Sequence, residues 1–325
     1  MPRFEDRETF ADRAGKATTD MRKVFEKTPL QRNDYLSARY DSNIYLKRED
    51  LTPVRSYKLR GAFNSMRKMR GVSHFVCASA GNHAQGVAFM ASHFDVKATI
   101  YMPVTTPQQK VSKTKIFGGN NIEIKLIGDY FDECLAAAQA FAVAENAYFI
   151  SPFDDADVIE GQGTVAVEIE QQLGSVPDRI IMPVGGGGLA SGITSFFGTN
   201  CQYSFVEPAG AASLKAALIA GQPEKLPRID NFTDGASVAR IGDKNFDVLK
   251  NFSIEDVSII QENRICTTML EMLDLEGIVL EPAGALLIDV LKDISDEIIG
   301  QNIVCITTGG NFDFERLPEV KERAA

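Results

Sequence analysis

Short apolar runs, each followed by a turn and then by a helical stretch, repeat along this chain of 325 residues. Runs of this kind predict buried strands, and the amphipathic stretches between them predict helices. Strands that alternate with helices are typical of parallel sheets covered by helices, so the pattern predicts an α/β protein with mostly parallel sheets. The predicted strands of this repeat are residues 74–79, 98–104, 122–128, 179–184, 202–208 and 302–307.

The first part of the chain departs from this repeat. TFADRAGKATTDMRKVF (9–25) predicts a polar helix, and NIYLKRED (43–50) predicts a short strand. The strand–helix units form two groups, before and after roughly residue 155, and a length of ~100–200 residues per domain also favours two domains. Ligands of open α/β sheets bind at the carboxyl ends of the strands. The turns SAGN, GGGG and TGGN are therefore candidates for one shared site.

Composition and charge exclude several classes of function. The chain has 34 Lys and Arg against 44 Asp and Glu, a net charge of −10, and no long basic run. This balance argues against a nucleic-acid partner or an anionic membrane surface. The N-terminus lacks the apolar core of a signal peptide, and the uncharged stretch 180–206 contains six glycines and is not read as a membrane span. Five scattered cysteines predict free thiols in a reducing compartment, so we expect a cytoplasmic protein.

Four consecutive glycines stand between a predicted strand and a predicted helix, at residues 185–188. Backbone N–H groups at such a turn, together with the N-terminus of the following helix, bind phosphate. A flexible turn or close helix packing is the alternative, but four glycines lose much entropy on folding, which favours the anion site. The chain has no G-x-x-x-x-G-K-[ST] motif, and GQGTVA (161–166) follows no strand directly. We interpret that segment as a helix start rather than a dinucleotide fingerprint.

The stretch VRSYKLRGA places Lys58 where a helix is predicted to begin, with Ser56 as its N-cap. A cation at the positive end of a helix is disfavoured by a few tenths to ~1 kcal/mol, and Arg55 and Arg60 add to the repulsion. Either Lys58 extends to water, or its surroundings lower its pKa. A lysine with a lowered pKa is a neutral amine, which is the nucleophilic form.

Two further strand ends offer polar groups. SAGNHAQG (79–86) supplies a hydroxyl, backbone N–H groups and the Asn82 amide, although plain helix capping would explain it equally well. ITTGGN ends in Thr307 and Thr308. A phosphate cradle, a lysine of lowered pKa, an amide for a ring oxygen and a hydroxyl for a ring nitrogen are what pyridoxal phosphate requires. Hydrolase motifs are absent from the sequence, and its only histidines, His74, His83 and His93, are too few for a His-rich metal site.

Six motifs occur in the order and approximate spacing of threonine dehydratases, and they span about residues 28–317. The chain therefore resembles this family of fold-type II pyridoxal-phosphate enzymes, to which serine racemase and the tryptophan synthase β-chain also belong. The resemblance implies two open, twisted, mostly parallel sheets flanked by helices. It implies a large cofactor-binding domain of residues 1–50 and 155–325 and a small domain of residues 51–154. The motifs are KREDLTPVRSYKLRGAFNSM, ASAGNHAQGVA, PVGGGGLASG, VEPAGAASL, EPAGA and TTGGNFD.

The resemblance also implies a role for individual residues. Lys58 would hold the cofactor covalently and then remove the substrate Cα proton. Asn82 would bind the 3′-oxygen of the ring, and Thr308, where close relatives have serine, would face the ring nitrogen. A neutral hydroxyl does not force protonation of that nitrogen, which suits expulsion of a β-hydroxyl. The implied phosphate ligands are the backbone N–H groups of Gly185, Gly186, Gly187, Gly188 and Leu189, and the implied loop for the substrate carboxylate contains Ser79, Gly81 and His83.

Departures from the family pattern narrow the expected activity. Serine racemases have a serine where this chain has Ala80, and metal-binding relatives have an aspartate where it has Ser213. We therefore expect an L-specific lyase without a metal. The chain ends soon after TTGGN, so we do not expect the C-terminal regulatory domain of isoleucine-inhibited members.

The expected activity is conversion of L-threonine to 2-oxobutanoate and ammonia, as in isoleucine biosynthesis, by a homodimer or homotetramer with side activity on L-serine. Sister activities on the same site are the nearest alternatives: L-serine dehydratase, serine racemase or 3-hydroxyaspartate dehydratase. A non-catalytic amino-acid sensor and a nucleotide-binding regulator that uses the glycine turn are alternatives from other classes.

Overall fold

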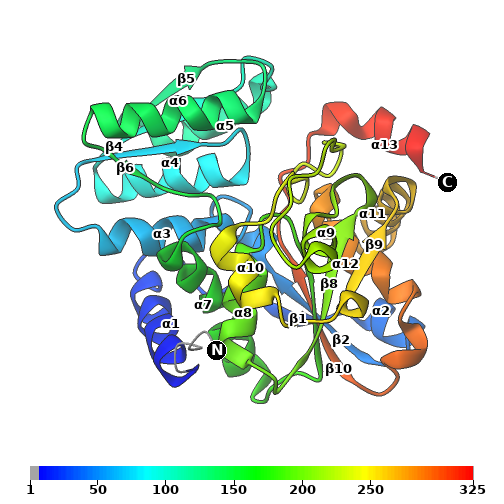
Figure 1. Ribbon diagram of the computed structural model, residues 1–325. Coiled ribbons are helices and arrows are strands. Elements are labelled where there is room, and N and C mark those ends of the chain that lie inside the picture. Colours follow the sequence, from blue (N-terminus) through cyan, green and yellow to red (C-terminus); the bar gives the residue numbers. More distant parts are fainter. Residues whose placement is uncertain (1–6, 325) are drawn as a thin grey trace.

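The computed structural model describes residues 7–324, and two separate sheets organise it (Figure 1). The strands of the smaller sheet are β3 (His74–Ala78), β4 (Lys97–Met102), β5 (Ile122–Leu126) and β6 (Tyr148–Phe149). Those of the larger sheet are β1 (Leu30–Arg32), β2 (Asn43–Arg48), β7 (Arg179–Pro183), β8 (Gln202–Pro208), β9 (Val257–Ile260) and β10 (Asn302–Thr307). The strand orders are β5-β4-β3-β6 and β1-β2-β10-β7-β8-β9. Every pairing is parallel except that of β1 with β2.

The predicted fold class is confirmed. All six strands of the repeat are present, and their ends lie within two residues of the expected positions. Central strands such as β7 and β10 are nearly continuous apolar runs, because both faces of the sheet are covered there. In β10, for example, Ile303 and Cys305 pack into the core on one face, whereas Val304 and Ile306 pack into the core on the other. The short strands β1 and β6 and the strand β9 were not predicted.

Helices cover both sheets, and α3 and α7 lie between them (Figure 1). α3 packs on α4 of the smaller unit and on α7, and α7 in turn packs on α8 and α1. The helix that carries Lys58 is therefore held from both units. The α-helices are α1 (Arg7–Met21), α2 (Asp34–Arg39), α3 (Lys58–Lys68), α4 (Asn82–Phe94), α5 (Gln108–Gly118), α6 (Phe131–Ala144), α7 (Ala156–Leu173), α8 (Gly188–Phe197), α9 (Ser213–Ala220), α10 (Asp243–Leu249), α11 (Glu262–Glu276), α12 (Pro282–Asp289) and α13 (Leu317–Arg323).

The predicted helix start at Gly161 is wrong. α7 begins at Ala156, where the Asp155 carboxylate accepts hydrogen bonds from two backbone N–H groups of the first turn, and Gly161 lies inside the helix. An interior glycine costs ~1 kcal/mol relative to alanine. Here a Cβ on Gly161 would lie only 2.6 Å from the carbonyl oxygen of Arg60 and 2.8 Å from the Cα of Gly61. The glycine thus lets α3 and α7 pack at backbone contact, which local sequence rules do not report.

Two other expectations concern cysteines and membranes. All five cysteines are free and buried, as predicted. Within residues 7–324, no helix has the length and apolar character needed to cross a membrane.

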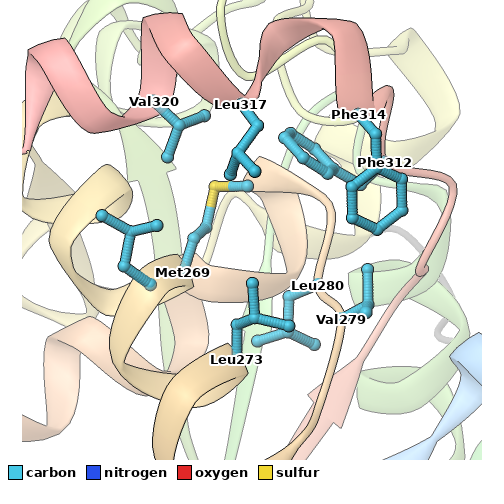
Figure 2. A pocket seen from close by; sticks show the side chains of 9 residues that line it. Met269, Leu273, Val279, Leu280, Phe312, Phe314, Leu317 and Val320 are labelled. Carbon is cyan, nitrogen blue, oxygen red and sulfur yellow. The ribbon is translucent and has the colours of Figure 1, made fainter.

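An apolar crevice lies between α11 and α13 (Figure 2). Its volume of about 20 Å³ is close to the space that a single water molecule needs, so it is a packing feature of the C-terminal helix rather than a substrate site. Its labelled lining residues are Met269, Leu273, Val279, Leu280, Phe312, Phe314, Leu317 and Val320.

Candidate active site

Lys58 is the first residue of α3. Its Nζ donates a 2.8 Å hydrogen bond to the neutral carbonyl oxygen of Pro152 and lies 5.9 Å from the centre of the Phe153 ring. Burial of the amine lowers the pKa of Lys58 from 10.5 to about 8, and the negative charge of Glu281 opposes that shift. A substantial fraction of the amine is therefore neutral at slightly alkaline pH, as a nucleophile or proton acceptor requires.

The means by which the chain positions Lys58 differ from the sequence prediction. Ser56 does not cap α3: the cap is Tyr57, with no side-chain hydrogen bond, and Ser56 instead pairs with Gly309 in an isolated β-bridge. The Tyr57 N–H donates to the Thr308 carbonyl over 3.1 Å. The start of α3 is thus fixed by backbone pairing with the end of β10, a contact between segments about 250 residues apart that no local pattern reveals.

The two arginines near Lys58 do not lower its pKa. The guanidinium of Arg60 is bound by the carboxylates of Glu49 and Glu168, which neutralise it. The side chain of Arg55 is exposed to solvent, which screens its charge. Burial, and not cationic repulsion, is the main physical cause of the lowered pKa.

Asn82 lies at the start of α4 and belongs to a buried polar network. Its Nδ2 donates to both carboxylate oxygens of Glu281 at 3.0 Å, and its Oδ1 accepts a 2.8 Å bond from Nδ2 of Asn311. Burial raises the pKa of Glu281 from 4.5 to about 7, and the hydrogen bond from Asn82 opposes this rise. The network therefore joins Asn82 to an ionisable group that titrates near neutral pH.

Glu281 and Asn311 were missed as functional residues at the sequence level. Glu281 is 4% exposed and interacts electrostatically with Lys58. A signal was present in the sequence, because Glu281 is the single charged residue in the apolar run GIVLEPAGALLI. A charge in such a run is buried only where it is paired or functional.

Thr308 follows β10 directly and is 2% exposed. Its hydroxyl has no hydrogen-bond partner among residues 7–324. A buried hydroxyl without a partner is costly, and such groups mark places where a ligand completes the bonding. An aromatic ring nitrogen would satisfy this hydroxyl, so Thr308 fits the role that the resemblance implied.

The tetraglycine turn connects β7 to α8, which begins at Gly188. Gly187 has φ of +92°, a conformation that side chains rarely adopt. The carbonyl oxygen of Gly186 accepts a 2.8 Å hydrogen bond from Nδ2 of Asn245, a residue of α10. The turn is therefore rigid and precedes a helix N-terminus, the arrangement that binds phosphate through backbone N–H groups. Leu189 is buried in the first turn of that helix.

A methyl group at Gly186 would overlap the ring of Phe153, the residue that follows the Pro152 partner of Lys58. We predict that Gly186→Ala lowers the free energy of unfolding by ~1–3 kcal/mol, because either the Phe153 ring or the backbone of the turn must shift to make room for the methyl group. It should also weaken phosphate binding. Urea unfolding of both proteins measures the first effect.

Gly15→Ala is the matched control for that substitution. No heavy atom of the described chain lies within 4 Å of a Cβ built on Gly15, which is inside α1. This variant should raise the unfolding free energy by ~0.5–1 kcal/mol. Equal behaviour of the two alanine variants would show that the space at Gly186 is not restricted.

The loop implied for the substrate carboxylate follows β3. The Ser79 hydroxyl accepts a 3.2 Å bond from the Gly81 N–H, and a Cβ on Gly81 would meet no described atom within 4 Å. His83 instead turns inward, where its Nε2 lies 3.1 Å from the Ile150 carbonyl oxygen. Burial, with the charge of Lys58, lowers the pKa of His83 to about 3, so its ring is neutral. His83 therefore offers no positive charge to a carboxylate.

Glu207, the acidic residue of the VEPAGAASL motif, accepts hydrogen bonds from the backbone. Its carboxylate accepts hydrogen bonds from the N–H groups of Leu214 (2.7 Å) and Lys215 (3.0 Å) at the start of α9. Within residues 7–324, no three His, Cys, Asp or Glu side chains gather as a metal site would need.

A cavity of about 270 Å³ opens beside this polar network. Asn311 lies in its wall, as does Pro282, the neighbour of Glu281, and Lys110 of α5 forms an ion pair with Asp234 across it. A space of this size admits an amino acid. The other lining residues are Pro107, Asn231, Phe312, Asp313 and Arg316.

The rigid glycine turn, the buried amine and the unpartnered hydroxyl fit a small aromatic phosphate that binds lysine, and comparison with known proteins agrees. The family profile of pyridoxal-phosphate dependent enzymes matches residues 21–309. The chain belongs to this family, and pyridoxal phosphate is its cofactor.

The similar proteins include biosynthetic threonine dehydratases and threonine deaminases. The chain is 49% identical to the biosynthetic L-threonine dehydratase IlvA of Lactococcus lactis, over 94% of this chain and 75% of that protein. It is 46% identical to the IlvA of Bacillus subtilis, over 95% of this chain and 74% of that protein. Among solved structures, the processed form of threonine deaminase isoform 2 from Solanum lycopersicum superposes with a TM-score of 0.91 at 35% identity, covering 98% of this chain and 88% of that one. The chain spans about three quarters of the length of the IlvA relatives.

Proposed function

We propose that this protein is a pyridoxal-phosphate-dependent L-threonine ammonia-lyase, which converts L-threonine to 2-oxobutanoate and ammonia. The observation that carries the proposal is the Lys58 amine bonded to the Pro152 carbonyl at the start of a helix whose preceding residue, Tyr57, pairs with the backbone of Thr308. The buried hydroxyl of Thr308 has no partner among residues 7–324. The identity of 44–49% to threonine dehydratases supports the choice of substrate.

Each residue of the site has a task in this reaction. Pyridoxal phosphate, when bound, withdraws electrons from the substrate Cα. Lys58 Nζ binds the cofactor and afterwards accepts the Cα proton. Asn82, held in place by Glu281 and Asn311, orients the ring through its 3′-oxygen. Thr308 supplies a neutral hydroxyl to the ring nitrogen, which leaves the ring a weaker electron acceptor and so favours departure of the β-hydroxyl.

The cofactor phosphate and the substrate carboxylate are assigned to two turns that offer backbone N–H groups. The N–H groups of residues 185–189 hold the phosphate. Ser79 and Gly81 hold the substrate carboxylate, and His83 supports this loop from behind as a neutral ring. The cavity beside Asn311 is large enough for an amino acid, and we propose it as the entrance for the substrate.

Turnover of three β-hydroxy amino acids tests the proposal. We expect the protein loaded with cofactor to form 2-oxobutanoate from L-threonine, at a higher kcat/KM than pyruvate from L-serine, and to leave 3-hydroxyaspartate unchanged. Keto acid is measured with a coupled dehydrogenase, and a chiral assay detects D-serine. Formation of D-serine, or preference for another substrate, would assign a sister activity. Binding of amino acids without any keto acid would indicate a sensor.

We also propose the wider organisation that the resemblance implies. The two sheets support a large domain of residues 1–50 and 155–325 and a small domain of residues 51–154. The buried, unpaired cysteines support a reducing, cytoplasmic compartment. We propose a homodimer or homotetramer, which light scattering measures directly.

A further inference from the structure

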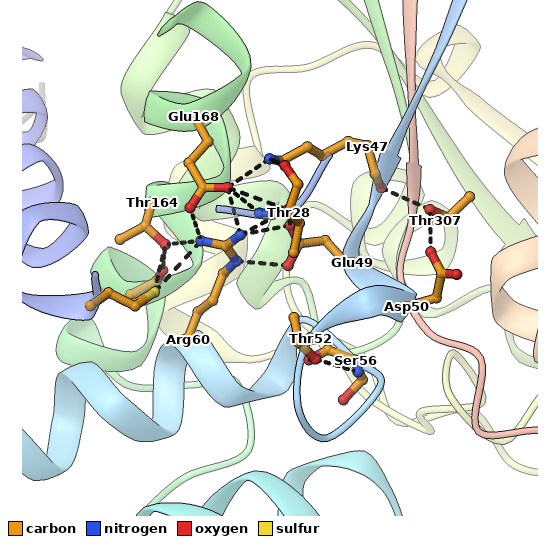
Figure 3. A network of polar contacts seen from close by, with 12 residues as sticks. Thr28, Lys47, Glu49, Asp50, Thr52, Ser56, Arg60, Thr164, Glu168 and Thr307 are labelled. Atoms are coloured by element: carbon orange, nitrogen blue, oxygen red, sulfur yellow. Dashed lines mark hydrogen bonds and ion pairs between the residues drawn. The ribbon is translucent and has the colours of Figure 1, made fainter. Parts of the chain in front are cut away.

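Arg60 is the third residue of α3, two positions after Lys58, and its side chain is completely buried. Its guanidinium forms two bonds to Glu49, of 2.7 and 2.8 Å, and two bonds to Glu168, each of 2.9 Å (Figure 3). Two bidentate contacts fix a planar guanidinium in both position and rotation.

Lys47 completes the group, which we call the Arg60 cluster: Lys47, Glu49, Arg60 and Glu168. Lys47 Nζ lies 2.6 Å from Glu168 Oε2, and the four side chains are at most 1% exposed. The cluster holds two positive and two negative charges, and Arg22, which is partly exposed, also forms an ion pair with Glu168. Burial opposes ionisation of Glu168, but the charges of Arg60 and Lys47 hold its pKa well below the usual range. Each charged side chain of the cluster is therefore paired with a partner of opposite charge.

The cluster joins three parts of the fold. Lys47 belongs to β2, and Glu49 begins the short 3-10 helix Glu49–Leu51 that follows it. Arg60 belongs to α3, and Glu168 belongs to α7. α3 is thereby tied to the larger sheet and to the neighbouring helix at the same point. Thr164 of α7 adds a 3.1 Å bond to the guanidinium.

The position of Arg60 on the helix determines where Lys58 points. Two residues correspond to a rotation of about 200°, so the two side chains leave α3 on nearly opposite sides. Arg60 faces the cluster, and Lys58 reaches Pro152 on the other side. Because α3 is a rigid element, a rotation or shift that relaxes Arg60 moves the amine of Lys58 away from Pro152 and from Phe153. A buried ion pair adds little net stability, whereas its geometry is highly directional.

We propose that Arg60 is a positioning residue for Lys58: its double fork to Glu49 and Glu168 sets the rotation of α3 that places the amine in the active site. The proposal rests on the proposed role of Lys58 as the cofactor-binding lysine. Neither carboxylate touches the reacting atoms, so the cluster acts only through the helix.

Arg60→Lys tests this directly, because it keeps the charge and the buried stem but removes the fork. The full chain, freed of cofactor, is methylated with formaldehyde and cyanoborohydride across a pH series, and Lys58 is followed by peptide mass spectrometry. In the unmodified protein, the pH at which methylation of Lys58 reaches half of its maximal rate (the midpoint) should lie near 8. In Arg60→Lys it should rise by at least one pH unit toward that of an exposed lysine, and the Kd for pyridoxal phosphate should increase at least tenfold.

A matched control lies on α12. Asp289 is completely buried and binds Arg264 (2.6 Å) and Lys292 (2.8 Å), far along the chain from Lys58. Asp289→Asn also breaks a buried ion cluster, but it should leave the Lys58 midpoint and the cofactor Kd unchanged. Equal changes in both variants would show a general loss of stability and would overturn the proposal.

If Arg60→Lys does not fold, Glu49→Gln is the second test variant. It weakens only one of the two forks and leaves Arg60 bound to Glu168. It should move the Lys58 midpoint and the Kd in the same direction, by a smaller amount. A folded variant of either kind with wild-type midpoint and Kd would overturn the proposal. These readouts need no threonine, so a failure of the proposed catalytic function would be seen separately, as absence of turnover in the unmodified protein.

Discussion

Lys58→Ala is expected to abolish keto acid formation from L-threonine, by a factor of about 10⁴ or more. In the proposed mechanism Lys58 both attaches the cofactor and accepts the Cα proton, so the variant would lack both functions. The visible absorption of the lysine-bound cofactor should disappear, and borohydride should no longer fix the cofactor to the chain. Absorbance spectra and the coupled assay measure the two effects.

The fold should survive this substitution, because within residues 7–324 the Lys58 side chain has one hydrogen bond, to the Pro152 carbonyl, and the residue lies at the start of a helix. Circular dichroism provides that check. Lys97→Ala is the matched control, since Lys97 is 55% exposed and begins a strand of the smaller sheet. Visible absorption that persists in Lys58→Ala and vanishes in another lysine variant would show that the wrong lysine was assigned.

Glu281→Gln should change how stability depends on pH. Burial raises the pKa of Glu281 from 4.5 to about 7, so between these values the folded chain keeps a proton that the unfolded chain has released. The contribution of Glu281 to stability therefore falls as pH rises from 4.5 to 7, by ~3 kcal/mol, and is constant above that range. Glutamine cannot ionise. The variant without cofactor should match the wild type near pH 4.5 and exceed it by up to ~3 kcal/mol near pH 8.

Urea unfolding at a series of pH values, with cofactor removed, measures this difference. Glu207→Gln is the matched control, because burial raises the pKa of Glu207 to about 7 as well. Glu281 is the carboxylate that acts on Lys58, and its charge raises the pKa of the lysine. Only Glu281→Gln should therefore lower the pH midpoint of Lys58 methylation below 8. A midpoint that moves equally in both variants, or in neither, would contradict the proposed pairing of Glu281 with Lys58.

The polar network also explains why Glu281 is retained despite its destabilising burial. Its two carboxylate oxygens hold the Asn82 amide, and a Cβ on Gly309 would collide with it. Asn82 is thereby presented in one orientation, with its oxygen engaged by Asn311. A rigid amide loses less entropy when it binds a ring oxygen, which is a benefit for binding rather than for stability.

Sequence patterns were enough to predict most of the strands and the tetraglycine turn before α8, and to single out Lys58 and Thr308 as candidate site residues. These features depend on short-range rules: apolar runs report burial, glycines report backbone conformation, and a strand end reports proximity to other strand ends. Only packing in three dimensions lowers the pKa of Lys58, turns His83 inward and places Gly161 inside a helix. The tertiary structure also revealed Glu281, which is 199 residues from its partner Asn82, and Glu168, which is 108 residues from Arg60. Burial and charge compensation between such distant residues arise only when the chain is packed, and local sequence patterns carry no record of them.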